Sequence, residues 1–356
     1  MKPNFNNCPL NLVASIEKHY GYKLDNFESI EEIDKKLVGK KHIFLIVLDG
    51  LGTKIIEKNL KENSFIRTHG YKTMSTLFPS TTACVTVAIQ SGHLPNDTGY
   101  FGWHQYFKEF GRDIVLFKNQ DYYTNERLST RLPISYKRFY DKYDNISTYS
   151  LFPKWDMEHG YKNIHAQMKK MVEIAKSSDE TFTYCYYDDP DYIIHNYGTN
   201  GKKTRRVIKK IDNELRWLNA RLGDESIVFV TADHGLIDTK TIFLEDYPAL
   251  VEQLELKPSI EARCTTFKVK PGSRFKELFN HYFPTGFELY TKEGFLNSDY
   301  IFKTKYENRI EEFIFDYVAV ATDKYSFAFT RSKKEFKAAH AGATEDEMLI
   351  PLIIFF

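Results

Sequence analysis

Three short apolar runs, each closed by an aspartate-rich turn, constrain the fold of this chain more than any other feature. They span residues 42–48, 181–187 and 226–231, and they lead into Asp49-Gly50, Asp188-Asp189-Pro190-Asp191 and Asp233-His234-Gly235. Continuous apolar runs of this length are typical of strands that are buried on both faces, as in parallel sheets covered by helices. Helical patterns separate the runs, so the sequence predicts an α/β fold.

The remaining patterns indicate how the chain is divided. Apolar residues recur at helical spacing near 53–60, 164–175 and 208–222, whereas 99–155 shows no clear period and is predicted to be irregular. From 246 to 323 the pattern becomes strand, helix, strand, which indicates a small inserted α+β subdomain. We expect residues 1–245 and 324–356 to form a mostly parallel central sheet sandwiched by helices, which the apolar run 349–356 rejoins.

Charge and hydropathy exclude several classes of protein. Lys and Arg total 49 against 48 Asp and Glu, so a general nucleic-acid binder or membrane-surface binder is not expected. Residues 1–12 lack the apolar region of a secretory signal, and the longest apolar runs are too short to span a bilayer. We therefore expect a cytoplasmic protein. Its four cysteines include no CxxC pair and are interpreted as buried residues, not disulfide partners.

The stretch from residue 77 to 95 places two hydroxyls, those of Thr81 and Thr82, just before an apolar run that is predicted to be helical. A helix N-terminus offers unpaired N–H groups and the positive end of the helix dipole, which suit a phosphate or an alkoxide. The alternative is an ordinary helix cap.

Aspartates and histidines from segments far apart in the sequence are expected to meet these hydroxyls. The carboxyl ends of strands in an open α/β sheet line one crevice, and side chains four residues apart, such as Asp191 and His195, share one face of a helix. Three Asp, three His and one Thr suit two divalent ions, whereas the carboxylates would repel one another without metal. The set comprises Asp49, Thr82, Asp191, His195, Asp233, His234 and His340.

With these residues in place, the chain resembles the alkaline phosphatase superfamily and, within it, the type I phosphodiesterase/nucleotide pyrophosphatase branch. The matching segments run in the family's order: Val47-Leu-Asp-Gly50, Phe78-Pro-Ser-Thr-Thr-Ala83 with Ser91-Gly92, Tyr186-Tyr-Asp-Asp-Pro-Asp191 with His195, Thr231-Ala-Asp-His-Gly235, and His340 with Gly342. The resemblance implies an alkaline phosphatase-like core. It also implies one metal held by Asp49, Asp233, His234 and the nucleophile, and a second held by Asp191, His195 and His340.

The resemblance also implies the nucleophile and the type of substrate. In the superfamily the nucleophile lies ten residues before the Gly of a Ser-Gly or Thr-Gly pair; counting back from Gly92 selects Thr82 over Thr81. Phosphatases of the family with a third, magnesium-like site carry a Glu five residues before the Asp that here is Asp191. Tyr186 stands at that position, so the resemblance implies phosphodiester or phosphoanhydride cleavage.

Three residues are candidates for binding the substrate, namely Trp103, His104 and Tyr186. Phosphodiesterases of the branch often have an Asn some twenty residues after the nucleophile, where this chain has Gly102-Trp103-His104-Gln105. Trp103 could stack on a base or belong to the core. The basic run from Lys202 to Arg206 could attract an anion, although a solvated helix face is the preferred interpretation.

The sequence therefore predicts a two-metal phosphodiesterase or nucleotide pyrophosphatase that acts on a small phosphodiester or nucleotide through a covalent threonine intermediate. Zinc is favoured by intrinsic affinity, and manganese is the alternative. Other possibilities are a phosphomonoesterase, phosphonate hydrolase or phosphomutase on the same scaffold, or an inactive metal-binding regulatory relative. The sequence indicates no oligomeric state.

Overall fold

The main sheet organises the fold. The computed structural model describes residues 1–304, 308–331 and 335–356. Five neighbouring strands of the sheet, from β9 to β7, are mutually parallel, and β18 runs antiparallel to both of its neighbours. In spatial order the strands are β2 (Gly70–Ser75), β18 (Leu349–Phe355), β9 (Ser226–Thr231), β1 (His42–Leu48), β8 (Thr181–Tyr187), β6 (Ser147–Pro153) and β7 (Gly160–Tyr161).

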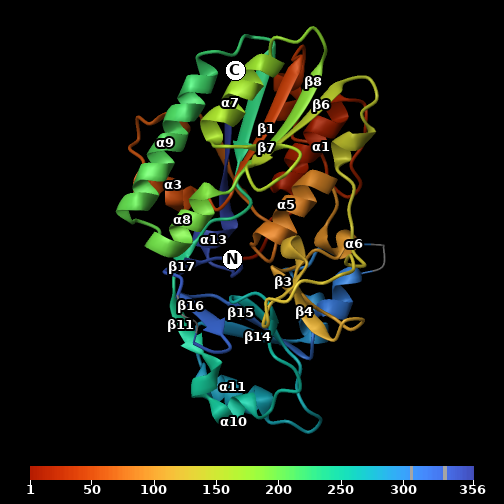
Figure 1. The fold of residues 1–356 in the computed structure, drawn as a ribbon, viewed down its shortest axis with the longest axis vertical. Helices are drawn as coiled ribbons and strands as arrows, with labels where there is room; N and C mark the ends of the chain where they lie inside the picture. Colours follow the sequence, from red (N-terminus) through yellow and green to blue (C-terminus); the bar gives the residue numbers. More distant parts are fainter. Residues whose placement is uncertain (305–307, 332–334) are drawn as a thin grey trace.

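Helices cover both faces of this sheet, as Figure 1 shows. On one face, α9 (Lys202–Asn219) packs against α3 (Thr53–Asn59), α4 (Phe65–Thr68), α7 (Ile164–Ile174) and α8 (Asp189–Tyr197). On the other, α1 (Pro9–His19) packs against α2 (Glu31–Leu37) and α5 (Thr82–Ser91), and α6 (Pro95–Thr98) follows. Every residue of β1, β8 and β9 is buried, which explains their uninterrupted apolar sequences. The predicted α/β class, a central sheet sandwiched by helices, is confirmed.

A second sheet of seven strands lies below the first in Figure 1. Its order is β14 (Phe287–Thr291), β15 (Tyr317–Ala321), β13 (Cys264–Phe267), β12 (Ser259–Ile260), β3 (His104–Phe107), β4 (Arg112–Val115) and β5 (Gln120–Asp121). Residues 246–323 supply the first four strands, with α10 (Pro248–Val251), α11 (Phe275–Tyr282) and α12 (Lys292–Leu296). The proposed division into a core and an insertion stays a prediction.

The stretch 99–155 is not irregular as predicted, because it contains β3, β4, β5 and β6. The first three strands are two to four residues long, and β3 pairs with β12 from a distant part of the chain. Strands this short contain too few alternating apolar and polar residues to be predicted from the sequence. Within the described ranges, 3-10 turns also occur at Leu116–Lys118, Phe139–Lys142, Leu244–Asp246 and Arg309–Phe313.

Small elements join the two sheets near the end of the chain. The pairs are β10 (Ile237–Asp238) with β17 (Ala338–Ala339), and β11 (Lys240–Phe243) with β16 (Tyr325–Ala328), and α13 (Glu345–Met348) precedes β18. All four cysteines are buried and free. None of the helices in the described ranges has the length and hydropathy needed to cross a lipid bilayer.

Candidate metal centre

The carboxyl ends of β1, β8 and β9 meet at one edge of the main sheet. In the parallel register Leu48 lies beside Tyr187, and Val47 lies beside Thr231. The turns that follow these strands therefore start side by side, which brings Asp49 next to Asp233. The Oδ1 atom of Asp233 accepts hydrogen bonds from the backbone N–H groups of Gly50 and His234, each at 3.0 Å.

The seven residues singled out in the sequence lie around one centre. The Nε2 atom of His234 lies 3.4 Å from Asp49 Oδ1 and 3.5 Å from Asp233 Oδ2. On the neighbouring side, Asp191 Oδ1 lies 3.3 Å from His195 Nε2 and 3.9 Å from His340 Nε2. The rings of His234 and His340 stack with centroids 3.8 Å apart, which links the two sides.

All three histidines turn the same nitrogen toward the centre. Each Nδ1 atom lies at a backbone carbonyl: His195 at Ala338 (2.7 Å), His234 at Gly235 (3.1 Å) and His340 at Ser80 (3.2 Å). A hydrogen on Nδ1 that donates to the carbonyl leaves the lone pair of Nε2 free for a cation. Backbone geometry therefore holds the three rings in the tautomer that suits a metal ligand.

The carboxylates are buried together at an electrostatic cost. Burial, followed by the charges of Asp233 and Asp191, raises the pKa of Asp49 well above its usual value. Burial likewise raises the pKa of Asp233. At Asp191, burial acts in the same direction, but His195, His340 and His234 together outweigh it and lower the pKa of Asp191. The pairing with Asp191 raises the pKa of His195, whereas burial lowers that of His340.

Two buried oxygens of the cluster lack any hydrogen-bond donor, namely Asp191 Oδ1 and Asp233 Oδ2. Buried carboxylate oxygens are normally satisfied by hydrogen bonds or by a cation. Ligand atoms within 4.8 Å of one another form two overlapping sets, Asp49 with Asp233 and His234, and Asp191 with His234 and His340. The donor chemistry and the unsatisfied oxygens therefore fit divalent cations. His234 belongs to both sets, and His195 adjoins the second.

Thr82 is the first residue of α5, and its hydroxyl points into the cluster. Its Oγ1 atom lies 3.1 Å from His234 Nε2 and 3.4 Å from Asp49 Oδ1. The side chain of Thr81, the residue at the N-cap position, turns away from the cluster and donates a hydrogen bond to Glu261. Of the two candidate hydroxyls, that of Thr82 therefore lies among the predicted ligands.

The three residues predicted to bind the substrate have different surroundings. The hydroxyl of Tyr186 donates to Asp49 Oδ2, and burial followed by the charge of Asp49 raises its pKa well above the usual value. His104 is buried, with Nδ1 at 3.0 Å from Asp113 Oδ1 and its ring stacked on Tyr122. Trp103 is half-buried, and its backbone N–H donates to Glu261 at 2.8 Å. Their roles in binding substrate stay predictions.

Sequence reasoning missed several residues that support the cluster. Arg263 and Glu347 are fully buried and form a two-fold ion pair at 2.6 and 2.7 Å. Glu347 also accepts a hydrogen bond from the backbone N–H of Gly342 at 2.7 Å, which anchors the loop after His340. These contacts are not visible in the sequence, because nothing local in residues 258–263 points to residues 80–82 or 342.

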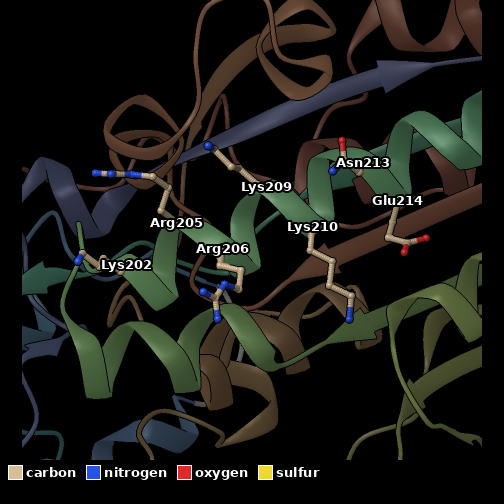
Figure 2. A pocket seen from close by; sticks show the side chains of 7 residues that line it. All are labelled: Lys202, Arg205, Arg206, Lys209, Lys210, Asn213 and Glu214. Carbon is tan, nitrogen blue, oxygen red and sulfur yellow. The ribbon is translucent and has the colours of Figure 1, made fainter.

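The basic run predicted as a possible anion attractor lies on α9. Figure 2 shows Lys202, Arg205, Arg206, Lys209 and Lys210 along this helix around a hollow that Asn213 and Glu214 also line. The five cations are exposed, and exposed charges gain little from one another or from a fixed geometry.

Comparison with known proteins identifies the family of this chain. A sequence model of the type I phosphodiesterases and nucleotide pyrophosphatases matches residues 43–343. A search of curated protein sequences finds no match.

Solved structures with the same fold include murine ectonucleotide pyrophosphatase/phosphodiesterase 5, with a TM-score of 0.62 at 14% identity over 88% of this chain and 87% of that chain. An inactive threonine-to-alanine variant of the murine protein, in complex with AMP, gives 0.64 at 15% identity over 89% and 88%. Phosphonoacetate hydrolase from Sinorhizobium meliloti, in complex with phosphonoformate, gives 0.62 at 15% identity over 87% and 89%.

Proposed function

Because this chain belongs to the type I phosphodiesterase/nucleotide pyrophosphatase family, whose sequence model covers residues 43–343, we propose that it hydrolyses phosphodiester or phosphoanhydride bonds with two divalent ions and a threonine nucleophile. The observation that carries this proposal is the buried cluster at the edge of the main sheet. Two of its carboxylate oxygens have no hydrogen-bond donor, and the hydroxyl of Thr82 lies 3.1 Å from His234.

Seven side chains would hold the ions. Asp49, Asp233, His234 and the Thr82 oxygen suit one site, and Asp191, His195 and His340 suit the other. When bound, two divalent ions would supply positive charge that lowers the pKa of the threonine hydroxyl and stabilises the attacking and leaving oxygens. Intrinsic affinity favours zinc, and manganese is the alternative.

Thr82 supplies the nucleophile in this proposal. Its Oγ1 atom would attack phosphorus, and the bond between phosphorus and the leaving-group oxygen would break. Water would then hydrolyse the resulting phospho- or nucleotidyl-threonine and regenerate the hydroxyl. Thr82 begins α5, and the first-turn N–H groups of a helix have no intrahelical acceptor. They can therefore donate hydrogen bonds to the non-bridging oxygens of the substrate.

Tyr186 supports a diester over a monoester. Its hydroxyl donates to Asp49 at the position where relatives with a third metal carry a carboxylate ligand. A site without that third cation neutralises a singly charged diester better than a doubly charged monoester. The AMP in the complex of the murine protein supports a nucleotide as substrate. The likeness to phosphonoacetate hydrolase supports a phosphonate as the second candidate.

The experiment is a metal analysis joined to a substrate panel. Protein purified without chelator is expected to carry close to two ions per chain by plasma mass spectrometry. With zinc or manganese it should hydrolyse bis(p-nitrophenyl) phosphate and the p-nitrophenyl ester of TMP faster than p-nitrophenyl phosphate or phosphonoacetate. A preference for the monoester would favour a phosphatase. Absence of both metal and turnover would favour an inactive regulatory relative.

A further inference from the structure

Glu261 connects the second sheet to the start of α5. It follows β12, and its Oε1 atom accepts two hydrogen bonds, one from the hydroxyl of Thr81 at 2.5 Å and one from the backbone N–H of Trp103 at 2.8 Å. Glu261 therefore contacts two segments that lie far from it in sequence. One of them immediately precedes the candidate nucleophile.

The contact to Thr81 changes how α5 begins. Thr81 is the N-cap residue, with extended backbone angles of φ −139° and ψ 149°. A threonine in this position usually accepts a hydrogen bond from an N–H group of the first helical turn. Here its side chain makes no such bond, because its hydroxyl donates to Glu261 instead. The hydroxyl that could otherwise cap the first-turn N–H groups of α5 is therefore held at Glu261.

We propose that Glu261 is a positioning residue for the phosphate site: by holding the Thr81 hydroxyl, it keeps the first-turn N–H groups of α5 open to the oxygens of a phosphoryl group. This inference rests on the proposed function only in taking the N-terminus of α5 as the place of the phosphoryl group. It concerns a side chain outside the metal cluster and assigns it no contact with the substrate.

The backbone around Glu261 is arranged so that the carboxylate can reach Thr81. Ile260 has a φ of +83°, a conformation that strongly disfavours a β-branched residue. Gly102 lies so close that a Cβ atom there would come within 2.7 Å of the carbonyl oxygen of Ile260. Any larger residue at 102 would push β12 and β3 apart. The close approach brings the N–H of Trp103 and the carboxylate of Glu261 together.

Burial explains why Thr81 depends on this partner. Thr81 has no exposed surface, so its hydroxyl loses its protein acceptor in a buried setting if Glu261 is removed. Removal of Glu261 would leave both the Thr81 hydroxyl and the N–H of Trp103 without this partner, and the Thr81 oxygen could then turn to accept from the first-turn N–H groups of α5, as an N-cap threonine usually does. A Thr81 oxygen that accepts from them would compete directly with a phosphate oxygen.

Binding of inorganic phosphate to the metal-loaded protein, measured by isothermal titration calorimetry, tests this competition. Glu261→Ala is expected to weaken phosphate binding by about 5- to 10-fold, the equivalent of one helix-cap hydrogen bond. Thr81→Val, which keeps the shape of the side chain but removes the hydroxyl, should bind phosphate nearly as well as the wild type. The double variant Glu261→Ala/Thr81→Val should recover to within about 2-fold of the wild type, because no hydroxyl remains to compete.

Glu261→Gln is the matched control, because its amide oxygen can accept the same two hydrogen bonds; phosphate affinity within about 2-fold of the wild type is expected. If Glu261→Ala fails to fold, Glu261→Gln and Thr81→Val still decide. A 10-fold change in either variant would overturn the inference. A double variant that binds no better than Glu261→Ala, or a wild type that binds no phosphate, would also overturn it.

Turnover of bis(p-nitrophenyl) phosphate by the same preparations separates this inference from the proposed function. A protein that shows the expected pattern of phosphate binding but hydrolyses nothing would contradict the proposed function and leave the role of Glu261 intact. Active protein in which Glu261→Ala binds phosphate normally would contradict only the role of Glu261.

Discussion

The cluster of possible metal ligands and the basic face of α9, which is formed by Lys202, Arg205, Arg206, Lys209 and Lys210, differ in how far water reaches their charges. Asp49 and Asp233 are 4% and 0% exposed and lie against further acidic and imidazole groups, whereas Lys209 and Lys210 project into solvent (Figure 2). Like charges that share a buried site repel one another strongly, and water screens the same repulsion on an exposed helix. Of the two groups of charges, only the buried one needs a ligand of opposite sign. A group of like charges that is buried without a sufficient counter-charge inside the protein is therefore a better indicator of a functional site than a group of exposed like charges.

A third arrangement lies between these two. Arg263 and Glu347 are as buried as the cluster, yet each charge finds its partner within the protein. Such a pair acts on stability, because removing one member leaves the other unpaired in a low dielectric. Mutations in the cluster, in the buried ion pair and on the basic face are therefore expected to have different consequences, and four experiments compare them.

The largest effect is expected inside the cluster. Thr82→Ala should lower kcat for a phosphodiester by at least about 1000-fold, since the attacking oxygen is lost. The ligand carboxylates and imidazoles remain, so metal content should stay close to that of the wild type. Steady-state kinetics and plasma mass spectrometry measure the two quantities. Thr82→Ser keeps a hydroxyl and serves as the control; an Ala variant with normal turnover would assign the nucleophile to another residue.

The second effect concerns the buried pair and appears in stability. Arg263→Met should lower the free energy of unfolding by about 3–5 kcal/mol, because Glu347 is left buried without its partner. Urea denaturation followed by circular dichroism measures the change. Arg274→Met is the matched control, since its ion pair with Glu277 is exposed, and it should change stability by less than about 1 kcal/mol. Equal losses in both variants would contradict the contrast between the two settings.

The third experiment tests whether the cluster contains two separate metal sites. His340→Ala should weaken one of the two metal sites by at least about 10-fold, because His340 lies 3.9 Å from Asp191 on one side of the cluster. The ion expected at Asp49 and Asp233 should be retained, so a metal titration should show one strong and one weakened step. Two sites with wild-type affinity would mean that His340 is not a ligand.

The smallest effect is expected on the basic face. The double substitution K209E/K210E should change the free energy of unfolding by less than about 0.5 kcal/mol. The kcat/KM for an anionic diester should change by less than about 3-fold if this face is only solvated. Kinetics at low and high salt provide the check. A large loss at low salt that disappears at high salt would instead show that the face steers anions toward the site.

The sequence predicted the main sheet well because its strands carry their own signal. The bounds 181–187 and 226–231 agree with β8 and β9, whose residues are all buried and apolar enough to stand out. The strands β3 to β5 lack such a signal, since they are short and β3 depends on β12, which lies more than a hundred residues away. A strand stabilised mainly by a distant partner is not visible in its local sequence.

Like the fold, the candidate site has one part that can be predicted from the sequence and one part that cannot. Asp49, Asp191 and Asp233 follow buried strands, so their convergence at one sheet edge can be derived from topology. The seven residues do lie together, while their catalytic roles stay predictions. The contact between Glu261 and Thr81 could not be derived, because it requires the backbone of Ile260 at a φ of +83° and the close approach of Gly102. Neither feature follows from residue type or spacing.

The position of β18 in the main sheet has a consequence for biosynthesis. It is hydrogen-bonded on one edge to β9 and on the other to β2, which ends at Ser75, while β18 begins only at Leu349. At about 5–20 residues per second, a ribosome needs roughly 14 to 55 s to translate the intervening residues. Throughout that interval the nascent β2 has no place in the sheet, and once β9 (Ser226–Thr231) has been made, its edge lacks its final neighbour. Such unpaired edges invite aggregation, so this chain is expected to depend on chaperones until residue 355 has emerged.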